Sequence, residues 1–415
     1  MAGILEVRLG ERLVGTLANL PGDANLFIFA EEYADDPNRP VLSQGLIDDD
    51  GSLRQPRQVR RVAPPFFANL LPEDRSPLRA FLARQHQLNP NRDFPFLRVL
   101  GGDLPGNVIV TDAAAPVARD DGGARDAELD GDLAKAAGEM PRMRFSLAGV
   151  QMKFSASMKN DRLTLPASGA GGDWIVKLPS ERYPYLTHNE ATTMAIARDL
   201  GLNVPATRLT PMHEIEGIPE GLQHLGPAFA IERFDRFASD RRVHFEDFCQ
   251  VAGLPPAGKY EEKTMEWVWG AFARLCPPQD IDELVRRFVF GAIVGNDDMH
   301  LKNWAVVYPD GRSARIAPLY DFLPTRRYTQ GRTMALAIGG DNRWARLSWE
   351  SLVTCARTAD VRVRRVLAAA AETIGAFRER WPNMRDRFED PQAVNTIEHQ
   401  LRNVPLLRTG PPRIS

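Results

Sequence analysis

The chain has 415 residues, of which 43% are hydrophobic, and this is enough for two or more domains with cores of their own. Its 52 basic and 54 acidic residues nearly balance, which argues against a chain whose whole surface binds nucleic acid. The three cysteines lack metal-type spacing, no apolar run is long enough to span a membrane, and the start has no signal-peptide pattern. We therefore expect a cytoplasmic protein with reduced core thiols and no membrane contact.

Short strands separated by turns that contain glycine are predicted near the N-terminus, at residues 4–9, 13–17 and 25–30. A helical pattern follows at residues 78–85. These elements predict that residues 1–110 form a small α/β subdomain.

The composition changes after this subdomain. Residues 111–139 are rich in Ala, Asp and Gly and have scarcely any large apolar side chain, so they are expected to be either a flexible connection or a polar helix that packs little. After this polar linker we predict a strand-rich lobe at residues 140–237 and a helix-rich lobe at residues 238–415. In the second lobe, residues 361–381 have the pattern of an amphipathic helix. The predicted fold class is α+β with two lobes.

The first motif lies at residues 145–155, where small residues are flanked by apolar ones. Such a hairpin can lie over phosphate groups and bind them through successive backbone N–H groups. The candidate nucleotide-binding residues are Ala148, Gly149, Val150, Gln151 and Lys153. An ordinary hairpin remains an alternative, because the segment lacks the three glycines of G-x-G-x-x-G.

The second motif, at residues 173–179, alternates like a half-buried strand and contains Lys177 near its end. A lysine on a strand can reach the α- and β-phosphates of a nucleotide, whereas an edge-strand lysine that discourages aggregation is the simpler alternative. The chain has only seven lysines, and Lys153, Lys177 and Lys302 all lie in candidate nucleotide segments. Glu190 could pair with Lys177 from the following helix, but an exposed contact along its own helix is the simpler expectation.

Residues 229–236 are predicted to form a strand that enters a charged connection. In a two-lobed kinase, this is where the lobes join and where backbone groups meet the adenine edge. Glu232 and Phe234 would supply those groups through their main chain. The alternative is a strand end that salt bridges stabilise.

The most informative motif is G-N-D-D-M-H-L-K-N at residues 295–303, which follows a helical pattern at residues 282–294. Moving a γ-phosphoryl group requires a carboxylate that orients the attacking hydroxyl and oxygen ligands that hold Mg²⁺. Asp298 and Asn303 are five residues apart, the spacing of a catalytic base and a metal-binding Asn in protein kinases, and Asp321 fits a second Mg²⁺ ligand. For the nine residues alone, a solvated turn is the alternative.

In this order along the chain, the motifs resemble the HipA family of bacterial serine/threonine kinases, which are the toxins of toxin–antitoxin pairs. The resemblance covers almost the whole chain. It includes four further segments: F-F-A-N-L-L-P-E at residues 66–73, L-G-L-N-V-P at 200–205, F-E-D-F-C-Q at 245–250 and K-Y-E at 259–261. It implies a two-lobed kinase-like fold that uses ATP and Mg²⁺.

Several residue roles follow from the resemblance. The implied roles are catalytic base for Asp298, Mg²⁺ ligands for Asn303 and Asp321, contact with the α/β-phosphates for Lys177, and main-chain contact with adenine for Glu232 and Phe234. His300 and Lys302 are expected to support the catalytic loop, where Lys302 either stabilises the migrating phosphoryl group or braces the loop. Ser146 corresponds to the serine that the family phosphorylates on itself, and a dianion there would disfavour a packed phosphate loop.

The resemblance also implies partners. It predicts a small helix-turn-helix antitoxin, similar to HipB, that binds the N-terminal region together with parts of the kinase core. DNA would then be contacted only indirectly, through the antitoxin. It suggests an aminoacyl-tRNA synthetase as the protein substrate. The Phe66-Phe67 pair could anchor an interface, although burial in the core is expected.

The chain departs from the family pattern at Asp297, where relatives commonly have Thr, and the extra carboxylate is expected to disfavour ionisation of the neighbouring Asp298. D-F-L at residues 321–323 replaces D-F-G, and A-P-E is absent, so regulation by an activation loop of that kind is not expected. Two other functions remain open. The D-x-H-x-x-N pattern also fits a small-molecule or phosphoinositide-type kinase, and a non-catalytic scaffold could partner a DNA-bound regulator.

Overall fold

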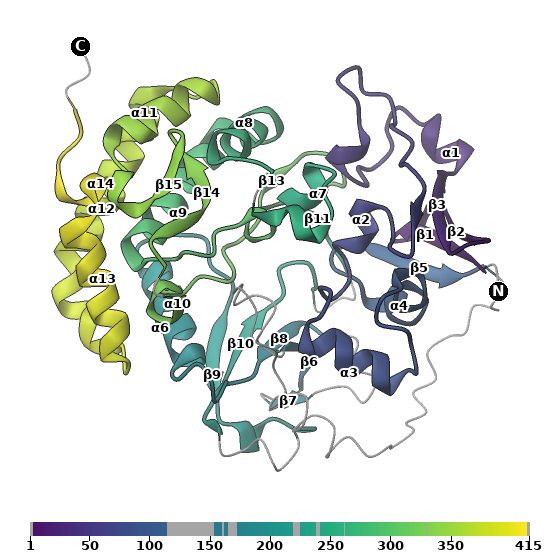
Figure 1. Cartoon of the computed structure of the whole chain (residues 1–415), viewed down its shortest axis with the longest axis horizontal. Helices are drawn as coiled ribbons and strands as arrows, with labels where there is room; N and C mark the ends of the chain where they lie inside the picture. Colours follow the sequence, from purple (N-terminus) through teal and green to yellow (C-terminus); the bar gives the residue numbers. More distant parts are fainter. Residues whose placement is uncertain are drawn as a thin grey trace.

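The computed structural model describes residues 3–113, 153–159, 162–164, 172–218, 225–237, 241–260, 262–329 and 331–412. Figure 1 shows an N-terminal region in purple and blue at one side, a teal sheet below, and green to yellow helices at the other side. This combination of helices and sheets confirms the predicted α+β class. The domain boundaries stay predictions, and residues 114–139 of the predicted linker lie outside the described residues.

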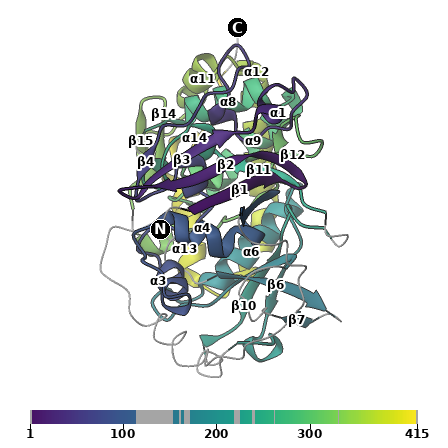
Figure 2. The same ribbon diagram turned by 90° about the vertical axis from the view of Figure 1, so that its right-hand side faces the viewer.

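The N-terminal sheet is antiparallel, with the strand order β4-β3-β2-β1-β5. Its strands are β1 (Gly3–Leu9), β2 (Arg12–Leu20), β3 (Ala24–Phe29), β4 (Val59–Arg60) and β5 (Val108–Asp112). Figure 2 shows this sheet facing the viewer. Alternation along β1 buries Leu5, Val7 and Leu9 on one face, so this face closes against a core. The three strands predicted here are confirmed.

Short helices also belong to the N-terminal region. They are α1 (Glu31–Ala34), α2 (Pro65–Ala68), α3 (Pro77–Gln85) and α4 (Asp93–Leu100). The helix predicted at residues 78–85 is confirmed as α3, whose first turn is capped by the Ser76 hydroxyl, which accepts a hydrogen bond from the Arg79 N–H. Phe66 and Phe67 of α2 are buried, as expected.

The second sheet has the strand order β7-β6-β8-β10-β9. Its strands are β6 (Lys153–Lys159), β7 (Arg162–Thr164), β8 (Trp174–Lys177), β9 (Thr207–Thr210) and β10 (Ala228–Glu232), and helix α6 (Leu186–Asp199) lies between β8 and β9 in the sequence. The central strand β8 pairs with β6 and β10, which sets Lys177 opposite both Lys153 and Phe229. The predicted strand at residues 173–179 is therefore confirmed, and it is central in this sheet, so the edge-strand alternative is wrong.

The two faces of this second sheet join different cores. Ala228 and Ala230 belong to the core that includes the N-terminal sheet, whereas Phe229 and Ile231 belong to the core of the helical lobe. Successive side chains of a strand point to opposite faces, so β10 takes part in both cores. The N-terminal sheet therefore shares one hydrophobic core with one face of the second sheet.

The C-terminal lobe is built mainly from helices. They are α7 (Phe248–Val251), α8 (Met265–Leu275), α9 (Pro278–Val294), α10 (Arg326–Thr329), α11 (Trp349–Thr358), α12 (Val363–Met384), α13 (Pro391–Asn403) and α14 (Pro405–Arg408). Two small antiparallel sheets accompany them: β11 (His244–Asp247), β12 (Ala305–Tyr308) and β13 (Arg315–Ile316) form one, and β14 (Thr333–Ile338) and β15 (Asp341–Arg343) form the other. The predicted amphipathic helix is confirmed as α12, which packs on α9.

The cysteines behave as the sequence predicted. Cys249, Cys276 and Cys355 are buried and unbridged, and burial raises the pKa of the Cys249 and Cys276 thiols to about 12. They are core thiols. Within the described ranges, every helix is too short or too polar to cross a membrane.

Candidate active site

Helix α9 delivers the predicted catalytic loop. Its last seven residues are all buried, and it ends at Gly295, whose φ of 74° lies in the left-handed region that favours glycine. The buried Asn296 side chain then accepts a hydrogen bond of 3.0 Å from the Asp298 N–H. The alternative of a solvated turn is wrong, because the polar residues of this loop are fixed in the interior.

Asp298 and Asn303 lie near the two ends of the catalytic loop, and a hydrogen bond links them. The Asn303 side-chain nitrogen donates to the Asp298 carbonyl oxygen over 2.7 Å, and both residues are only 8% exposed. An amide that donates through its nitrogen keeps its oxygen as the atom for a metal. The Asp298 carboxylate itself accepts a 2.7 Å hydrogen bond from the Tyr260 hydroxyl, a contact that the sequence analysis missed.

Asp321 meets this loop because the two segments are tied together. The Tyr320 hydroxyl donates to the Lys302 carbonyl oxygen over 2.8 Å. The next residue, Asp321, has a φ of 55°, which a residue other than glycine rarely adopts. Such a strained position is typical of functional sites, where the surrounding structure holds the residue in place.

Lys177 lies between two carboxylates. Its ammonium is 2.5 Å from Glu190 Oε1 and also contacts Asp321 Oδ1. Burial would lower the pKa of Lys177, but Asp321 and Glu190 more than offset this effect and raise it above its usual value. Glu190 is 1% exposed, so the expectation of a solvent-exposed contact along its own helix is wrong and the pairing alternative is right.

The two carboxylates carry unequal charge. Burial raises the pKa of Glu190 to about 7, against the opposing effect of Lys177. Burial also acts on Asp321, but the ammonium groups of Lys177 and Lys153 hold the pKa of this carboxyl well below its usual value. Asp321 is therefore an anion that lies beside two lysines, which suits a ligand of Mg²⁺ near phosphates.

His300 lies in the same cluster. It is 1% exposed, and neither ring nitrogen has a hydrogen-bond partner among the described residues. Burial first, and then the neighbouring Lys259 and Lys302, hold the pKa of His300 well below its usual value, so the ring is neutral. A buried ring with two unsatisfied nitrogens marks a position where further polar groups are expected to bind.

The described residues fit a Mg²⁺ ion that is also bound by waters and substrate phosphates. The described part of the chain has no group of three His, Cys, Asp or Glu side chains that could enclose a metal ion. Mg²⁺ is commonly held by one or two carboxylates together with waters and substrate phosphates. Asp321 and the Asn303 amide oxygen fit this pattern.

Lys302 has a bracing role in this structure. Its ammonium donates to the Asn69 backbone oxygen and to Asn69 Oδ1, each over 3.2 Å, and lies 3.7 Å from Asp247. These contacts match the loop-bracing alternative of the sequence analysis. They also bring a residue of the N-terminal region into the site.

The segment after β10 has features of both sequence-based alternatives, a connection that meets adenine and a strand end that salt bridges stabilise. Arg233 forms a salt bridge with Asp235 over 2.9 Å, as the structural alternative predicts. The Glu232 N–H donates to the Ala206 carbonyl oxygen, whereas the Phe234 N–H has no hydrogen-bond partner among the residues that the structure describes. The Phe234 ring lies 5.8 Å from that of Tyr320, so this connection runs beside the segment that carries Asp321.

Part of the predicted site cannot be placed. Ser146, Ala148, Gly149, Val150 and Gln151 lie outside the described residues. Lys153 begins β6 and is exposed, beside Lys177 in the sheet. The predictions for the phosphate loop and for Ser146 therefore stay predictions.

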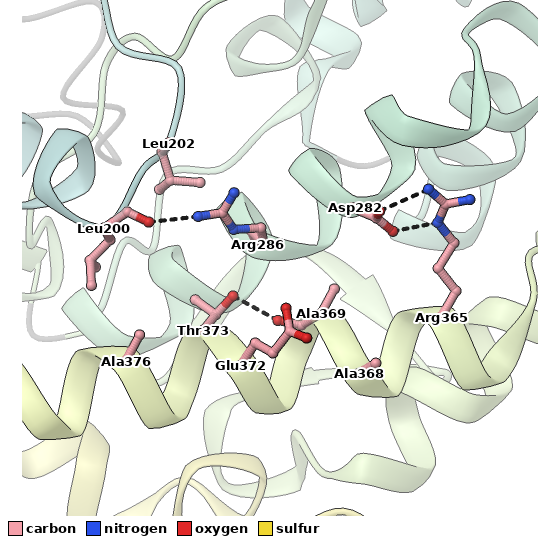
Figure 3. Close-up of a pocket in the computed structure, with 10 residues that line it drawn as sticks. All are labelled: Leu200, Leu202, Asp282, Arg286, Arg365, Ala368, Ala369, Glu372, Thr373 and Ala376. Carbon is pink, nitrogen blue, oxygen red and sulfur yellow. Dashed lines mark hydrogen bonds and ion pairs between the residues drawn. The ribbon is translucent and has the colours of Figure 1, made fainter.

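A hollow of about 500 Å³ lies between the end of α6, α9 and α12. Figure 3 shows the residues that line it. Its two arginines are already engaged: Arg365 donates two hydrogen bonds to Asp282, and Arg286 donates one to the Leu200 carbonyl oxygen. The residues that line it include none of the described candidates from the sequence. This hollow is separate from the predicted catalytic site.

The comparisons with known proteins agree on one family. The models of the HipA-like C-terminal domain and the HipA N-terminal domain match residues 145–381 and 5–111. A Sinorhizobium fredii protein named as a kinase, Y4dM, is 41% identical over 98% of both chains. The serine/threonine-protein kinase toxin HipA of Shewanella oneidensis is 26% identical over 80% of this chain and 78% of its own.

A solved structure has the same fold. The complex of Shewanella oneidensis HipA with HipB and operator DNA contains a chain that matches with a TM-score of 0.72 and 19% identity, over 96% of this chain and 95% of that one. This match confirms the two-lobed kinase-like fold. Because one family model alone matches more than half of the sequence, the chain belongs to the HipA family of kinase toxins.

Proposed function

We propose that this HipA-family kinase transfers the γ-phosphoryl group of ATP to serine or threonine in proteins and acts as the toxin of a toxin–antitoxin pair. Its own Ser146 is proposed as an acceptor whose phosphorylation inhibits the enzyme. A cytoplasmic location follows from this role. An aminoacyl-tRNA synthetase is the proposed cellular substrate.

One observation carries the proposal: Lys177 lies between Glu190 and Asp321, and the segment of Asp321 is bonded to the loop that holds Asp298 and Asn303. A phosphotransferase needs a positioned ammonium, a metal-binding carboxylate and a base close together. Bringing these charged groups together in the interior costs desolvation free energy, and a non-catalytic scaffold would gain nothing from it.

Asp298 is the group that would accept the proton of the acceptor hydroxyl. The Tyr260 hydroxyl already donates to this carboxylate, which shows that a hydroxyl can approach it. We infer that a serine hydroxyl gives its proton to Asp298 while its oxygen bonds to the γ-phosphorus and the bond to the β-phosphate oxygen breaks, releasing ADP. The same carboxylate thus orients the acceptor and takes its proton.

The phosphates and the adenine ring of ATP would contact different residues. Lys177 is proposed to bind the α- and β-phosphates, with Lys153 and the loop of residues 148–151 over them. Asn303 and Asp321 would hold Mg²⁺, which neutralises the charge that develops during transfer. The Glu232 carbonyl oxygen and the Phe234 N–H would meet the adenine edge.

A helix-turn-helix antitoxin is the proposed partner, since the solved relative of the same fold was captured with HipB and operator DNA. DNA contact would then occur through the antitoxin. A near-neutral chain, with 52 basic and 54 acidic residues, suits such indirect contact.

The test uses γ-labelled ATP with Mg²⁺, followed by mass mapping of the chain. We expect phosphate on Ser146 in the wild type and a loss of at least about 10²-fold in transfer rate in Asp298→Asn, with nucleotide binding intact in calorimetry. Equal labelling of Asp298→Asn would remove Asp298 as the base. Phosphate found only on small molecules or inositol lipids would favour the second kinase class.

A further inference from the structure

A short segment of the N-terminal region lies against the catalytic loop. We call residues 69–73 the strap. At one end, the Asn69 backbone oxygen and Asn69 Oδ1 accept from the Lys302 ammonium, each over 3.2 Å. At the other end, both oxygens of Glu73 accept from the Lys259 ammonium, over 2.7 and 2.8 Å. The strap therefore meets two lysines that come from distant parts of the sequence.

Asn69 is fixed from three sides. Its side-chain nitrogen donates to the Pro65 carbonyl oxygen over 2.9 Å and to the Leu254 carbonyl oxygen over 2.8 Å, while its oxygens face Lys302. The residue is 6% exposed. Helix α2, just before the strap, also packs against α7, which in turn contacts the 3₁₀ turn at Leu301–Asn303. A displacement of the strap would thus be transmitted to the catalytic loop.

Contacts through two neighbouring residues connect Glu73 to Asp298. Lys259, which is 4% exposed, lies 5.3 Å from the centre of the Tyr260 ring, and the Tyr260 hydroxyl donates to Asp298. The same ring packs edge-on against His300 at 5.0 Å. Burial disfavours the charge of Glu73, but Lys259 and Lys302 hold the pKa of this carboxyl below its usual value, so it stays an anion. The chain of contacts runs from Glu73 to Lys259, Tyr260 and Asp298.

We propose that the strap positions the catalytic machinery: Glu73 orients Tyr260 and hence Asp298 through Lys259, and Asn69 holds Lys302. The proposal rests on the kinase function given above. Asn69 and Glu73 are positioning residues, because they act through other side chains. The N-terminal region is then a component of the active site as well as a packing partner of the second sheet.

The competing explanation is ordinary packing between two regions. In that case, the ion pair of Glu73 and Lys259 would affect stability alone, and its loss would leave the turnover of the folded enzyme unchanged. Misplacing a reacting group by about 1 Å can cost about 10²-fold in rate, so a positioning role predicts a loss in kcat. The two explanations differ in kcat at constant nucleotide affinity.

The experiment compares Glu73→Gln with Glu31→Gln, the same change at an exposed position of the same region. The measurements are the initial rate of transfer from saturating γ-labelled ATP to the chain itself, taken as the apparent kcat, the dissociation constant for ATP by calorimetry, and the melting temperature. For Glu73→Gln we expect kcat to fall about 10- to 100-fold while ATP affinity changes less than about twofold. Glu31→Gln is expected to match the wild type in all three.

A double-mutant cycle tests the route of the effect. If Glu73 acts through Tyr260, the losses in kcat of Glu73→Gln and Tyr260→Phe will not multiply in the double variant, because both remove the same positioning. Glu73→Asp keeps the charge and should recover part of the kcat lost in Glu73→Gln. Should Glu73→Gln fail to fold, the same cycle is run with Glu73→Asp.

The outcomes separate the two proposals. A wild type that binds ATP but transfers no phosphate overturns the kinase function. An active wild type with unchanged kcat in the Glu73 variants, or with losses that multiply in the double variant, overturns the strap alone.

Discussion

Two buried ionic clusters in this molecule differ in their balance of charge. At the predicted site, the single ammonium of Lys177 faces the carboxylates of Glu190 and Asp321. After β10, two arginines and two aspartates form a closed ring, in which Arg233 and Arg236 each contact both Asp103 and Asp235, at 2.8 to 3.4 Å. In these contacts the first cluster has two carboxylates for one ammonium group, whereas the second has equal numbers of carboxylates and guanidinium groups.

This difference indicates different roles. Buried charges are costly unless they are paired, and the closed ring satisfies that requirement within the protein. It also joins the N-terminal region to the connection after β10, since Arg236 donates to the Leu104 and Gly106 carbonyl oxygens over 2.8 and 2.7 Å. In the open cluster two carboxylates share the Lys177 ammonium, so a bound Mg²⁺ would give Asp321 a further positive partner. We therefore interpret the ring as structural and the open cluster as a site for a cation and phosphates.

The largest expected effect comes from Asp321→Asn. It should abolish the Mg²⁺-dependent part of ATP affinity and lower the transfer rate at least about 10³-fold, which corresponds to about 4 kcal/mol. Without Mg²⁺ its melting temperature should fall below that of the wild type, because the Lys177 ammonium, which holds the pKa of Asp321 below its usual value, loses one of its two carboxylates. Calorimetry with and without Mg²⁺ measures the affinity, and Asp49→Asn at an exposed position is the matched control. Unchanged Mg²⁺-dependent binding would remove Asp321 from the metal site.

The opposite result is expected in the ring. Asp235 is 3% exposed and its carboxylate accepts from both arginines and from the Gly106 N–H, so Asp235→Asn would leave buried guanidinium groups poorly paired. We expect a loss of about 3 kcal/mol in the free energy of unfolding, measured by urea denaturation. ATP affinity of the folded protein should change little. A loss below about 1 kcal/mol would contradict the structural interpretation of the ring.

The comparison also shows what local sequence patterns can predict. The strands around Lys177, the end of α9 at Gly295 and the spacing of Asp298 and Asn303 depend on neighbours in the sequence, and all were predicted. Residues that depend on distant partners were missed or misjudged. Glu190 was expected to be exposed because a helix of mixed polarity gives no sign of a buried partner.

Distance along the chain explains the other omissions. Tyr260 lies 38 residues from Asp298, Glu73 lies 186 from Lys259, and Asp103 lies 133 from Arg236. Periodicity describes only which face of an element is buried, so it cannot pair charges between elements. The fold has to be known before such contacts can be inferred.

Glu246 is a third buried acid, and we expect its ionisation to change stability less than the two substitutions above. Glu246 is fully buried, and its hydrogen-bond donors among the described residues are all neutral: Ser43 Oγ at 2.6 Å, the Gln44 N–H at 2.9 Å and the Tyr308 hydroxyl at 2.5 Å. Burial raises its pKa from 4.5 to about 7, although these hydrogen bonds oppose the shift, and the nearby Asp247 adds to it. Glu246 avoids a buried negative charge by keeping its proton, whereas the aspartates of the ring are paired with arginines.

The sign of the pH dependence follows from this pKa. Between pH 4.5 and about 7 the folded protein keeps the Glu246 proton that the unfolded chain releases, so stability falls as the pH rises through this window. Relative to Glu246→Gln, which cannot ionise, the wild type should lose up to about 2 kcal/mol across it. Urea denaturation of both proteins from pH 5 to pH 8 measures the difference, and Glu31→Gln should show none. A constant difference would mean that Glu246 is ionised in the fold. A buried carboxylate without a cationic partner would then also occur outside the Lys177 cluster, and a surplus of carboxylates would not by itself identify that cluster as a cation site.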